Sequence, residues 1–222
     1  MPLSINNVTI ARVEIVDDDP VARAAYAYPI EDMELVPVFP DRLRYTDLHE
    51  FVNLVQQRAD AAICDYNLSV KNFANFYGSE TVSALYERGF PAILCTRYGK
   101  AEVDSIRPFR RYIPCLLTPD NLDPTTIEKG FRKCVEEIQG IFLPSRRPWR
   151  TLLYIEEYEN VRGYIYLIIP AWNPKEIISL RLDTLPIEIQ QLMKQGQSHF
   201  HAKVNLGAEN YEDLYFTDWE IE

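Results

Sequence analysis

The stretch VEIVDDDPVARAAY, residues 13–26, places three consecutive carboxylates directly after a short apolar run. The run is typical of a β-strand, and Pro20 fits the first turn of a helix over the residues that follow. The carboxylates of Asp17, Asp18 and Asp19 repel one another, so another interaction must offset the free-energy cost of this repulsion. Asp19 can cap the helix, whereas a divalent cation, which prefers oxygen ligands, can neutralise the whole group. The choice between a solvated loop and a cation site depends on what the other strand ends supply.

Short apolar runs alternate with helical patterns from residue 11 to about residue 140. The further expected strands are MELVPVF, AAICDY, FPAILCT and IPCLLT. Two longer helices are expected in TDLHEFVNLVQQR, capped by Thr46 or Asp47, and in DPTTIEKGFRKCVEEIQG, capped by Asp123. Two further helices are expected in SETVSALYERG, ending at Gly89, and in KAEVDSIRPFRRY, where Pro108 limits a short helix. Pro37 favours an edge position for the second strand. Five such alternations predict an α/β fold with a doubly wound, five-stranded parallel sheet.

The composition changes at FLPSRRPWR, residues 142–150, which we interpret as a solvated linker between two domains. The predicted domains are therefore residues 8–142 and residues 149–222. After the linker the expected elements are the strands RTLLYIEEYEN, GYIYLIIPAW and EIISLRLDTL, the short helix PIEIQQLMKQG, and the strands SHFHAKVNLG and YEDLYFTDWEI. This ββ-β-α-ββ order predicts a small β-rich α+β domain.

Charge and composition restrict the class of protein. The chain has 222 residues, a formal net charge of −10 and 47% hydrophobic residues, without a long apolar run or a basic signal segment. An acidic surface repels phosphate backbones, so we expect no nucleic-acid partner, and we expect no membrane span. The four cysteines lie far apart, and Cys64, Cys95 and Cys115 lie in strand-like runs, which indicates buried core thiols in a cytoplasmic protein.

Polar side chains follow several of the expected parallel strands at the point where each strand ends. Asp17 and Asp18 end the first strand, Asp65 ends the third within ICDYNL, and Thr96 ends the fourth within ILCTRYG. Ligands of doubly wound sheets gather outside the carboxyl ends of the strands. Three carboxylates and a hydroxyl thus predict a cation site, and without the cation at least one carboxyl pKa should be raised.

These residues resemble the receiver domain of bacterial two-component response regulators, over roughly residues 11–140. VDDDP matches the acidic pair of that family, Asp65 its phosphoacceptor and Thr96 its switch hydroxyl. The resemblance implies a flavodoxin-like fold. It also implies Mg²⁺ held by Asp18, Asp65 and the main-chain carbonyl of Asn67, with Asp17 acting through water.

The chain departs from the family pattern at the end of the fifth strand. Receivers have a lysine before a proline there, and the corresponding dipeptide is Thr118-Pro119 in CLLTPD. The position of the family's switch aromatic residue falls on Cys115. Threonine cannot replace the point charge of a lysine, and Lys100 and Arg97 are the nearby cations that could compensate.

The main hypothesis is a response-regulator-like signalling protein, not an enzyme. A histidine kinase or a phosphotransfer protein would phosphorylate Asp65, and the C-terminal domain would give the output through a downstream protein, with a homodimer left open. The alternative is a pseudo-receiver scaffold that binds partners independently of phosphate. A third hypothesis is an enzyme whose C-terminal domain holds a metal at His199 and His201, which lie two residues apart on one strand face.

Overall fold

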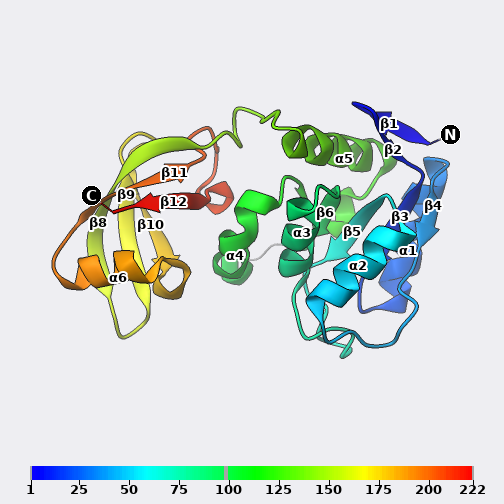
Figure 1. Cartoon of the computed structure of the whole chain (residues 1–222), viewed down its shortest axis with the longest axis horizontal. Coiled ribbons are helices and arrows are strands. Elements are labelled where there is room, and N and C mark those ends of the chain that lie inside the picture. Colours follow the sequence, from blue (N-terminus) through cyan, green and yellow to red (C-terminus); the bar gives the residue numbers. More distant parts are fainter. Residues whose placement is uncertain (1, 98–99, 222) are drawn as a thin grey trace. The chain divides into compact units, whose positions relative to one another are not determined.

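The computed structural model describes residues 2–97 and 100–221, which form two compact units (Figure 1). The first unit comprises residues 2–97 and 112–141, and the second comprises residues 100–111 and 142–221. Residues 100–111 fall inside the predicted first domain, yet they pack with the second unit. The domain limits 8–142 and 149–222 stay a prediction.

The first unit contains a five-stranded parallel sheet, which confirms the predicted doubly wound α/β fold class. Its strands in spatial order are β4 (Val36–Val38), β3 (Arg12–Val16), β5 (Ala61–Asp65), β6 (Ala92–Cys95) and β7 (Leu116–Leu117). As predicted, Pro37 lies in an edge strand, where its missing N–H removes no hydrogen bond from the centre of the sheet.

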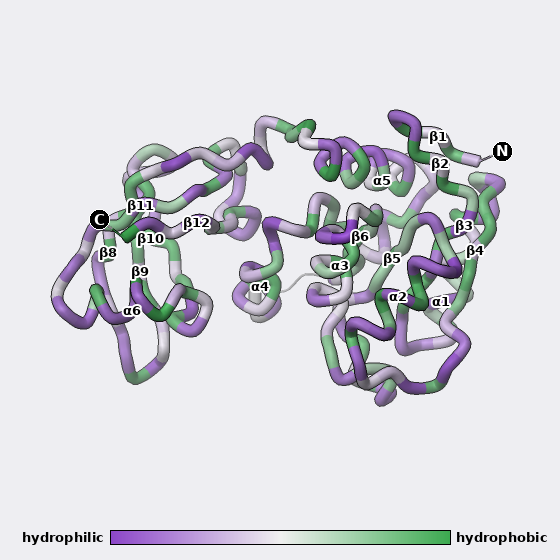
Figure 2. The backbone as a smooth tube through the Cα atoms, viewed as in Figure 1, coloured by the Kyte–Doolittle hydropathy of each residue, from purple (hydrophilic) through white to green (hydrophobic). Residues whose placement is uncertain are grey.

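Helices cover both faces of this sheet. α1 (Pro20–Asp32) and α5 (Pro124–Ile138) share the main core with β3, and Figure 2 shows the two hydropathy classes alternating along α5. Glu14, which alternates with the core residues of β3, instead contacts Arg58 of α2 (Leu48–Arg58), and α2 packs with α3 (Gly78–Glu87). Within residues 2–97 and 100–221, no helix has the length and apolar content needed to cross a bilayer.

Three aspartates cap the helices that follow strand ends, as the sequence predicted. The side chains of Asp19, Asp47 and Asp123 accept from the amides of Val21, Glu50 and Thr126 at 2.9, 2.8 and 3.0 Å, respectively. Each bond satisfies one of the free N–H groups of a first helical turn. One carboxylate of the DDD run is therefore already used in holding α1.

A short hairpin precedes the sheet and has no counterpart in the sequence analysis. It joins β1 (Leu3–Ile5) to β2 (Val8–Ile10) through Asn6 and Asn7, whose φ angles of 46° and 69° suit a tight two-residue turn. Ile5 and Ile10 are buried in the same core as α1 and α5.

The second unit is an antiparallel sheet with one longer helix, which confirms the predicted β-rich α+β fold and its ββ-β-α-ββ order. Its strands in spatial order are β10 (Asn173–Arg181), β9 (Tyr164–Ile169), β8 (Trp149–Glu159), β11 (His199–Val204) and β12 (Phe216–Glu220), and α6 (Ile187–Lys194) lies in sequence between β10 and β11. One face of the sheet buries alternate residues such as Leu153, Leu167 and Phe200 in a single core.

The second unit also contains α4 (Lys100–Ile106) and most of the 3₁₀ helix η1 (Arg107–Tyr112), so the α-helix ends before Pro108 and the chain continues more tightly wound. Arg146 is buried, and its guanidinium donates to the carbonyls of Arg110 and Arg111 at 2.9 and 2.8 Å. The interpretation of the 142–150 arginines as a solvated linker is therefore wrong for Arg146, because its side chain satisfies buried carbonyls.

Candidate functional site

The sheet register brings two carboxylates to one strand-end position. Val16 of β3 pairs with Cys64 of β5, so Asp17 and Asp65, which follow them, lie side by side. Asp17 is only 4% exposed and Asp65 is partly buried. Their closeness follows from the parallel pairing alone, as the sequence analysis expected.

The same rule places two hydroxyls on the neighbouring strands. Cys95 of β6 pairs with Asp65 on one side and with Leu117 of β7 on the other. Thr96 and Thr118, one residue further on, therefore lie opposite each other. Thr96 is buried, and Thr118 is half-buried at the start of the 3₁₀ helix η2 (Pro119–Asn121).

Burial disfavours the charged form of both carboxyl groups. Burial and, to a smaller extent, the charge of Asp17 together raise the pKa of Asp65 to about 7, although the amide of Asn67 donates to Asp65 at 2.8 Å and works against the shift. Burial also raises the pKa of Asp17 to about 6, with a smaller opposing effect from the amide of Asp19 at 2.6 Å. The direction agrees with the predicted raised carboxyl pKa, but burial is a larger cause than the repulsion between the carboxylates.

No lysine or arginine of the described residues forms an ion pair with Asp17 or Asp65. The guanidinium of Arg23 donates instead to the main-chain carbonyl of Asp17 at 2.9 Å. Among the described side chains the two carboxylates therefore have no ion-pair partner, and a carboxylate pair suits Mg²⁺, which commonly binds one or two carboxylates and keeps several waters. The donor set fits the ion that the resemblance implies.

The two other aspartates of the run contact a loop that follows β5. The amide of Lys71 donates to Asp18 Oδ2 at 2.6 Å, and Lys71 Nζ lies 2.9 Å from Asp19 Oδ1. Sequence reasoning missed Lys71. The available signal was its position as the first cation in the chain after Asp65.

Aromatic packing holds this loop, residues 66–77, in place. The rings of Tyr66 and Tyr77 stack at 5.2 Å between centroids, and the buried Phe73 and Phe76 lie 6.1 and 5.6 Å from Phe51 of α2. Aromatic packing therefore holds both ends of the loop and its second half in place. The first half of the loop passes over the acidic strand ends.

Gly78 fixes the distance between α3 and the strand end. Its amide donates to the carbonyl of Tyr66 at 2.8 Å, and a Cβ atom at this position would lie 1.8 Å from the carbonyl oxygen of Asp65. Only glycine allows so close an approach of two backbones. Sequence reasoning missed this residue as well.

The remaining predicted residues lie around this edge or beside it. Asn67 is exposed next to Asp65, Cys115 is buried in the core, and Arg97 is exposed. The side chain of Lys100 lies outside the part that the structure describes. Tyr26 of α1, which was not predicted, hydrogen-bonds the Cys95 thiol and has a raised pKa, first through burial and then through nearby acidic groups. Cys64, Cys95 and Cys115 are buried thiols, as predicted, and Cys134 is buried as well.

The histidine pair of the second unit has other contacts. His199 is exposed with its ring 4.7 Å from that of Tyr154, and His201 pairs in register with Glu220. Across residues 2–97 and 100–221, no three His, Cys, Asp or Glu side chains gather closely enough to form a metal cage by themselves. This holds for the histidine pair and equally for Asp17, Asp18 and Asp65, so a cation at the strand ends would also need main-chain or water ligands.

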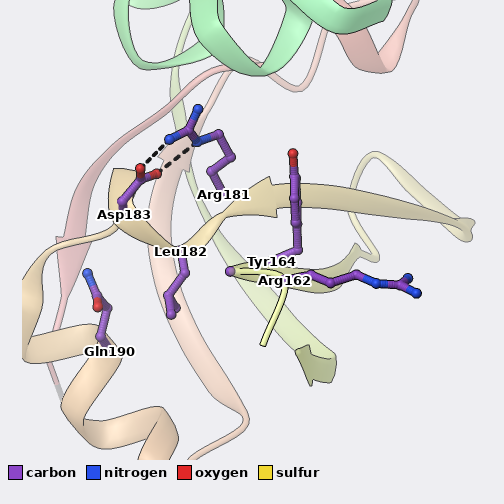
Figure 3. A pocket seen from close by; sticks show the side chains of 7 residues that line it. Arg162, Tyr164, Arg181, Leu182, Asp183 and Gln190 are labelled. Carbon is purple, nitrogen blue, oxygen red and sulfur yellow. Dashed lines mark hydrogen bonds and ion pairs between the residues drawn. The ribbon is translucent and has the colours of Figure 1, made fainter. Parts of the chain in front are cut away.

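A hollow of about 350 Å³ in the second unit is lined by polar side chains (Figure 3). Arg181 and Asp183 form an ion pair at its rim, and Arg162 points away from that pair. The hydroxyl of Tyr164 donates to Asp104 at 3.1 Å. These groups satisfy one another, so the hollow contrasts with the acidic strand ends of the first unit.

The chain is similar to solved receiver domains of response regulators. A receiver domain protein from Clostridium thermocellum matches with 11% identity and a TM-score of 0.44, covering 60% of this chain and 99% of that one. The receiver domain of an HD domain-containing protein from Pseudomonas fluorescens matches with 15% identity and a TM-score of 0.45, covering 62% and 96%. A chemotaxis response regulator of Vibrio cholerae matches with 21% identity and a TM-score of 0.41, covering 57% and 99%.

These similarities concern the fold, over about 60% of the chain. No protein-family profile matches the chain. No curated protein matches it either.

Proposed function

We propose that the first unit accepts a phosphoryl group on Asp65 from a histidine kinase or a phosphotransfer protein. The observation that carries this proposal is the pair of carboxylates formed by the buried Asp17 and the partly buried Asp65, which the sheet register places side by side and which form no ion pair with a described lysine or arginine side chain. A carboxylate at such a position can act as a nucleophile toward phosphorus. The buried hydroxyl of Thr96 lies one strand away.

The chemistry is the transfer of one phosphoryl group. An oxygen of Asp65 attacks phosphorus, the bond from phosphorus to the donor's histidine nitrogen breaks, and the imidazole leaves with that electron pair and takes a proton from solvent. Asp65 then carries an acyl phosphate, and Thr96 can donate a hydrogen bond to a phosphoryl oxygen. Because burial raises the pKa of Asp65 to about 7, a nearby cation would increase the share of its reactive ionised form at neutral pH.

Asp17, Asp65 and the main-chain carbonyl of Asn67 would hold Mg²⁺, together with Asp18 where the contact with Lys71 allows. Mg²⁺ favours the ionised carboxylates and shields Asp65 from the charge of the incoming phosphate. The protein's own contribution is to hold the carboxylates together and to keep Asp65 at the edge of the sheet, against Gly78.

The second unit is proposed as the output module of a cytoplasmic, bacterial-type signalling protein that is not itself an enzyme. Only residues 97–99 separate Thr96 from α4, and α4 packs with the second unit. A change at the Thr96 strand end can therefore pass along the chain into the second unit, whose surface would contact a downstream protein.

A pseudo-receiver scaffold is the second candidate, and Thr118 is the observation that favours it. The strand end that carries a lysine in the family bears a neutral hydroxyl here, and Cys115 stands in place of the aromatic residue. In that case the protein would bind its partners without being phosphorylated.

One experiment separates the two candidates. The full chain is incubated with acetyl phosphate and Mg²⁺ and its intact mass is followed, with Asp65→Asn as the control. We expect the wild type to gain one phosphoryl group and the variant none. A wild type that stays unmodified at high donor and Mg²⁺ concentrations would contradict the receiver proposal and favour the scaffold.

A further inference from the structure

The position of Lys71 points to a role that neither the fold nor the family pattern assigns. Within residues 2–97 and 102–221, it is the lysine whose ammonium contacts the DDD run, at 2.9 Å from Asp19. Its own amide is bound to Asp18 at 2.6 Å. One residue thus contributes a backbone contact and a charge contact to adjacent carboxylates.

We propose that Lys71 supplies the cationic contact to the phosphoryl group that Thr118 cannot make. This inference rests on the proposed phosphorylation of Asp65 and names a further residue of the same site. A dianionic phosphoryl group next to Asp17 needs a compensating charge. The family pattern provides that charge from the end of the fifth strand, whereas here it comes from the loop that follows Asp65.

The loop keeps the Lys71 backbone in place while its side chain stays movable. The bond to Asp18 and the packing of Phe73 and Phe76 against Phe51 fix the main chain near the acidic edge. The Lys71 side chain, by contrast, is 51% exposed. The ammonium can therefore change partners without moving the loop.

The present partner of the ammonium is weakly held. Asp19 is 40% exposed at its side chain, and an exposed ion pair of this kind contributes little to stability. Asp19 also keeps its capping bond to the amide of Val21 when Lys71 leaves. A phosphoryl group carries more charge than a single carboxylate, so it attracts the ammonium more strongly.

Other cations of the first unit are less suited to the task. The guanidinium of Arg23 donates to the main-chain carbonyl of Asp17. Arg97 is exposed and follows Thr96 on the far side of β5 from Asp17. Arg23 is also tied to the run by its main chain, but both of its bonds go to backbone carbonyls, whereas the amide and the ammonium of Lys71 both contact side-chain carboxylates.

The test compares the rates at which acetyl phosphate and Mg²⁺ label the full chain. Lys71→Met removes the charge and keeps the amide that binds Asp18, whereas Lys71→Arg keeps a positive charge. Lys133→Met, at an exposed position of α5, is the matched control. We expect Lys71→Met to be labelled roughly a hundredfold more slowly, Lys71→Arg to keep part of the rate, and Lys133→Met to behave as wild type.

A second variant guards against a purely structural effect. Adding Thr118→Lys to Lys71→Met should restore much of the rate, because a lysine at the strand end can reach the same phosphoryl group. Binding of beryllium fluoride with Mg²⁺, a non-covalent mimic of the phosphoryl group, should weaken in Lys71→Met and recover in the double variant. This readout does not depend on turnover.

The outcomes distinguish this inference from the proposed function. If the wild type is labelled and Lys71→Met is labelled equally fast or faster, Lys71 is only a surface ion pair or a blocking group, and the inference is overturned. If neither the wild type nor Asp65→Asn is labelled, the receiver proposal itself fails. In that case weakened beryllium fluoride binding by Lys71→Met would still support the contact, and unchanged binding would overturn it.

Discussion

The first unit buries negatively charged groups and the second buries positively charged ones. The two kinds of group differ in whether the protein supplies them with partners. In the first unit, Asp17 and Asp65 share a strand-end position and have raised pKa values. In the second unit, the buried Arg110 forms an ion pair with Asp213 at 2.8 Å, and the buried Arg146 donates to two carbonyls and lies 5.1 Å from the Tyr215 ring.

This difference separates charges that have partners within the protein from charges that a ligand could still stabilise. Burying a charge costs free energy unless partners replace the lost water. The arginines have their partners within the same unit, so they hold that unit together. For the two carboxylates, part of the free-energy cost of burial is not offset within the protein. A bound cation or protonation can offset it, so the carboxylates are suited to binding a ligand.

The largest expected effect comes from removing a satisfied charge. Arg146→Met removes two hydrogen bonds to the carbonyls of Arg110 and Arg111 and should lower the free energy of unfolding of the second unit by about 2–5 kcal/mol. Urea denaturation followed by tryptophan fluorescence measures this, because Trp149, Trp172 and Trp219 all lie in the second unit.

The neighbouring Arg147 provides the control for that measurement. It is exposed over the Trp149 ring at 4.5 Å, so Arg147→Met should cost at most about 1 kcal/mol. Equal losses in the two variants would mean that Arg146 is not a structural charge, and the comparison between the units would not hold.

Gly78→Ala should disturb the acidic edge next most strongly. A methyl group 1.8 Å from the Asp65 carbonyl cannot be accommodated, so α3 and β5 must separate, at a cost of about 1–3 kcal/mol. We expect a lower melting temperature by far-UV circular dichroism and weaker stabilisation by Mg²⁺. Ser79→Ala, one residue further along α3, serves as control, and unchanged Mg²⁺ stabilisation in Gly78→Ala would contradict the close approach.

Asp65→Asn should change stability in the opposite direction. Without Mg²⁺ at about pH 8, it removes a buried charge and should stabilise the first unit by about 1–2 kcal/mol. Asp213→Asn, which removes the partner of Arg110, should destabilise the second unit instead. Added Mg²⁺ should raise the melting temperature of the wild type and leave that of Asp65→Asn nearly unchanged. Loss of stability in Asp65→Asn would show that its charge is already satisfied.

The stability of the first unit should also depend on pH in Mg²⁺-free buffer. Both carboxyl groups have an ordinary pKa of 3.8, and burial raises them to about 6 for Asp17 and about 7 for Asp65. Between the ordinary pKa and the raised pKa of each group, the folded protein binds more protons than the unfolded chain. The free energy of unfolding should therefore fall as pH rises from about 4 to 7.

Denaturation at a series of pH values, with and without Mg²⁺, checks this dependence. Glu14, whose pKa burial raises to about 7 despite Arg58 at 2.8 Å, should contribute with the same sign but without dependence on Mg²⁺. A slope that is identical with and without Mg²⁺ would assign the whole effect to groups other than the acidic pair.

The five parallel strands of the first unit, its aspartate caps and its strand-end residues could be predicted from the sequence, whereas the β1–β2 hairpin could not. Apolar runs of four to seven residues, separated by helical patterns, leave few folds other than a parallel sheet. Parallel pairing then brings Asp17, Asp65 and Thr96 to one edge, because residues that end neighbouring strands must lie together. Local patterns were sufficient for these features.

The tertiary structure alone decided three further features. Lys71 contacts the acidic run because aromatic packing folds residues 66–77 back over it. Gly78 is required because the backbone of α3 approaches that of Asp65. Arg146, in a stretch that resembles an exposed linker, is buried because its guanidinium meets the carbonyls of η1. Each depends on contacts between segments distant in sequence, or on how closely two backbones approach, which no local pattern of residues encodes.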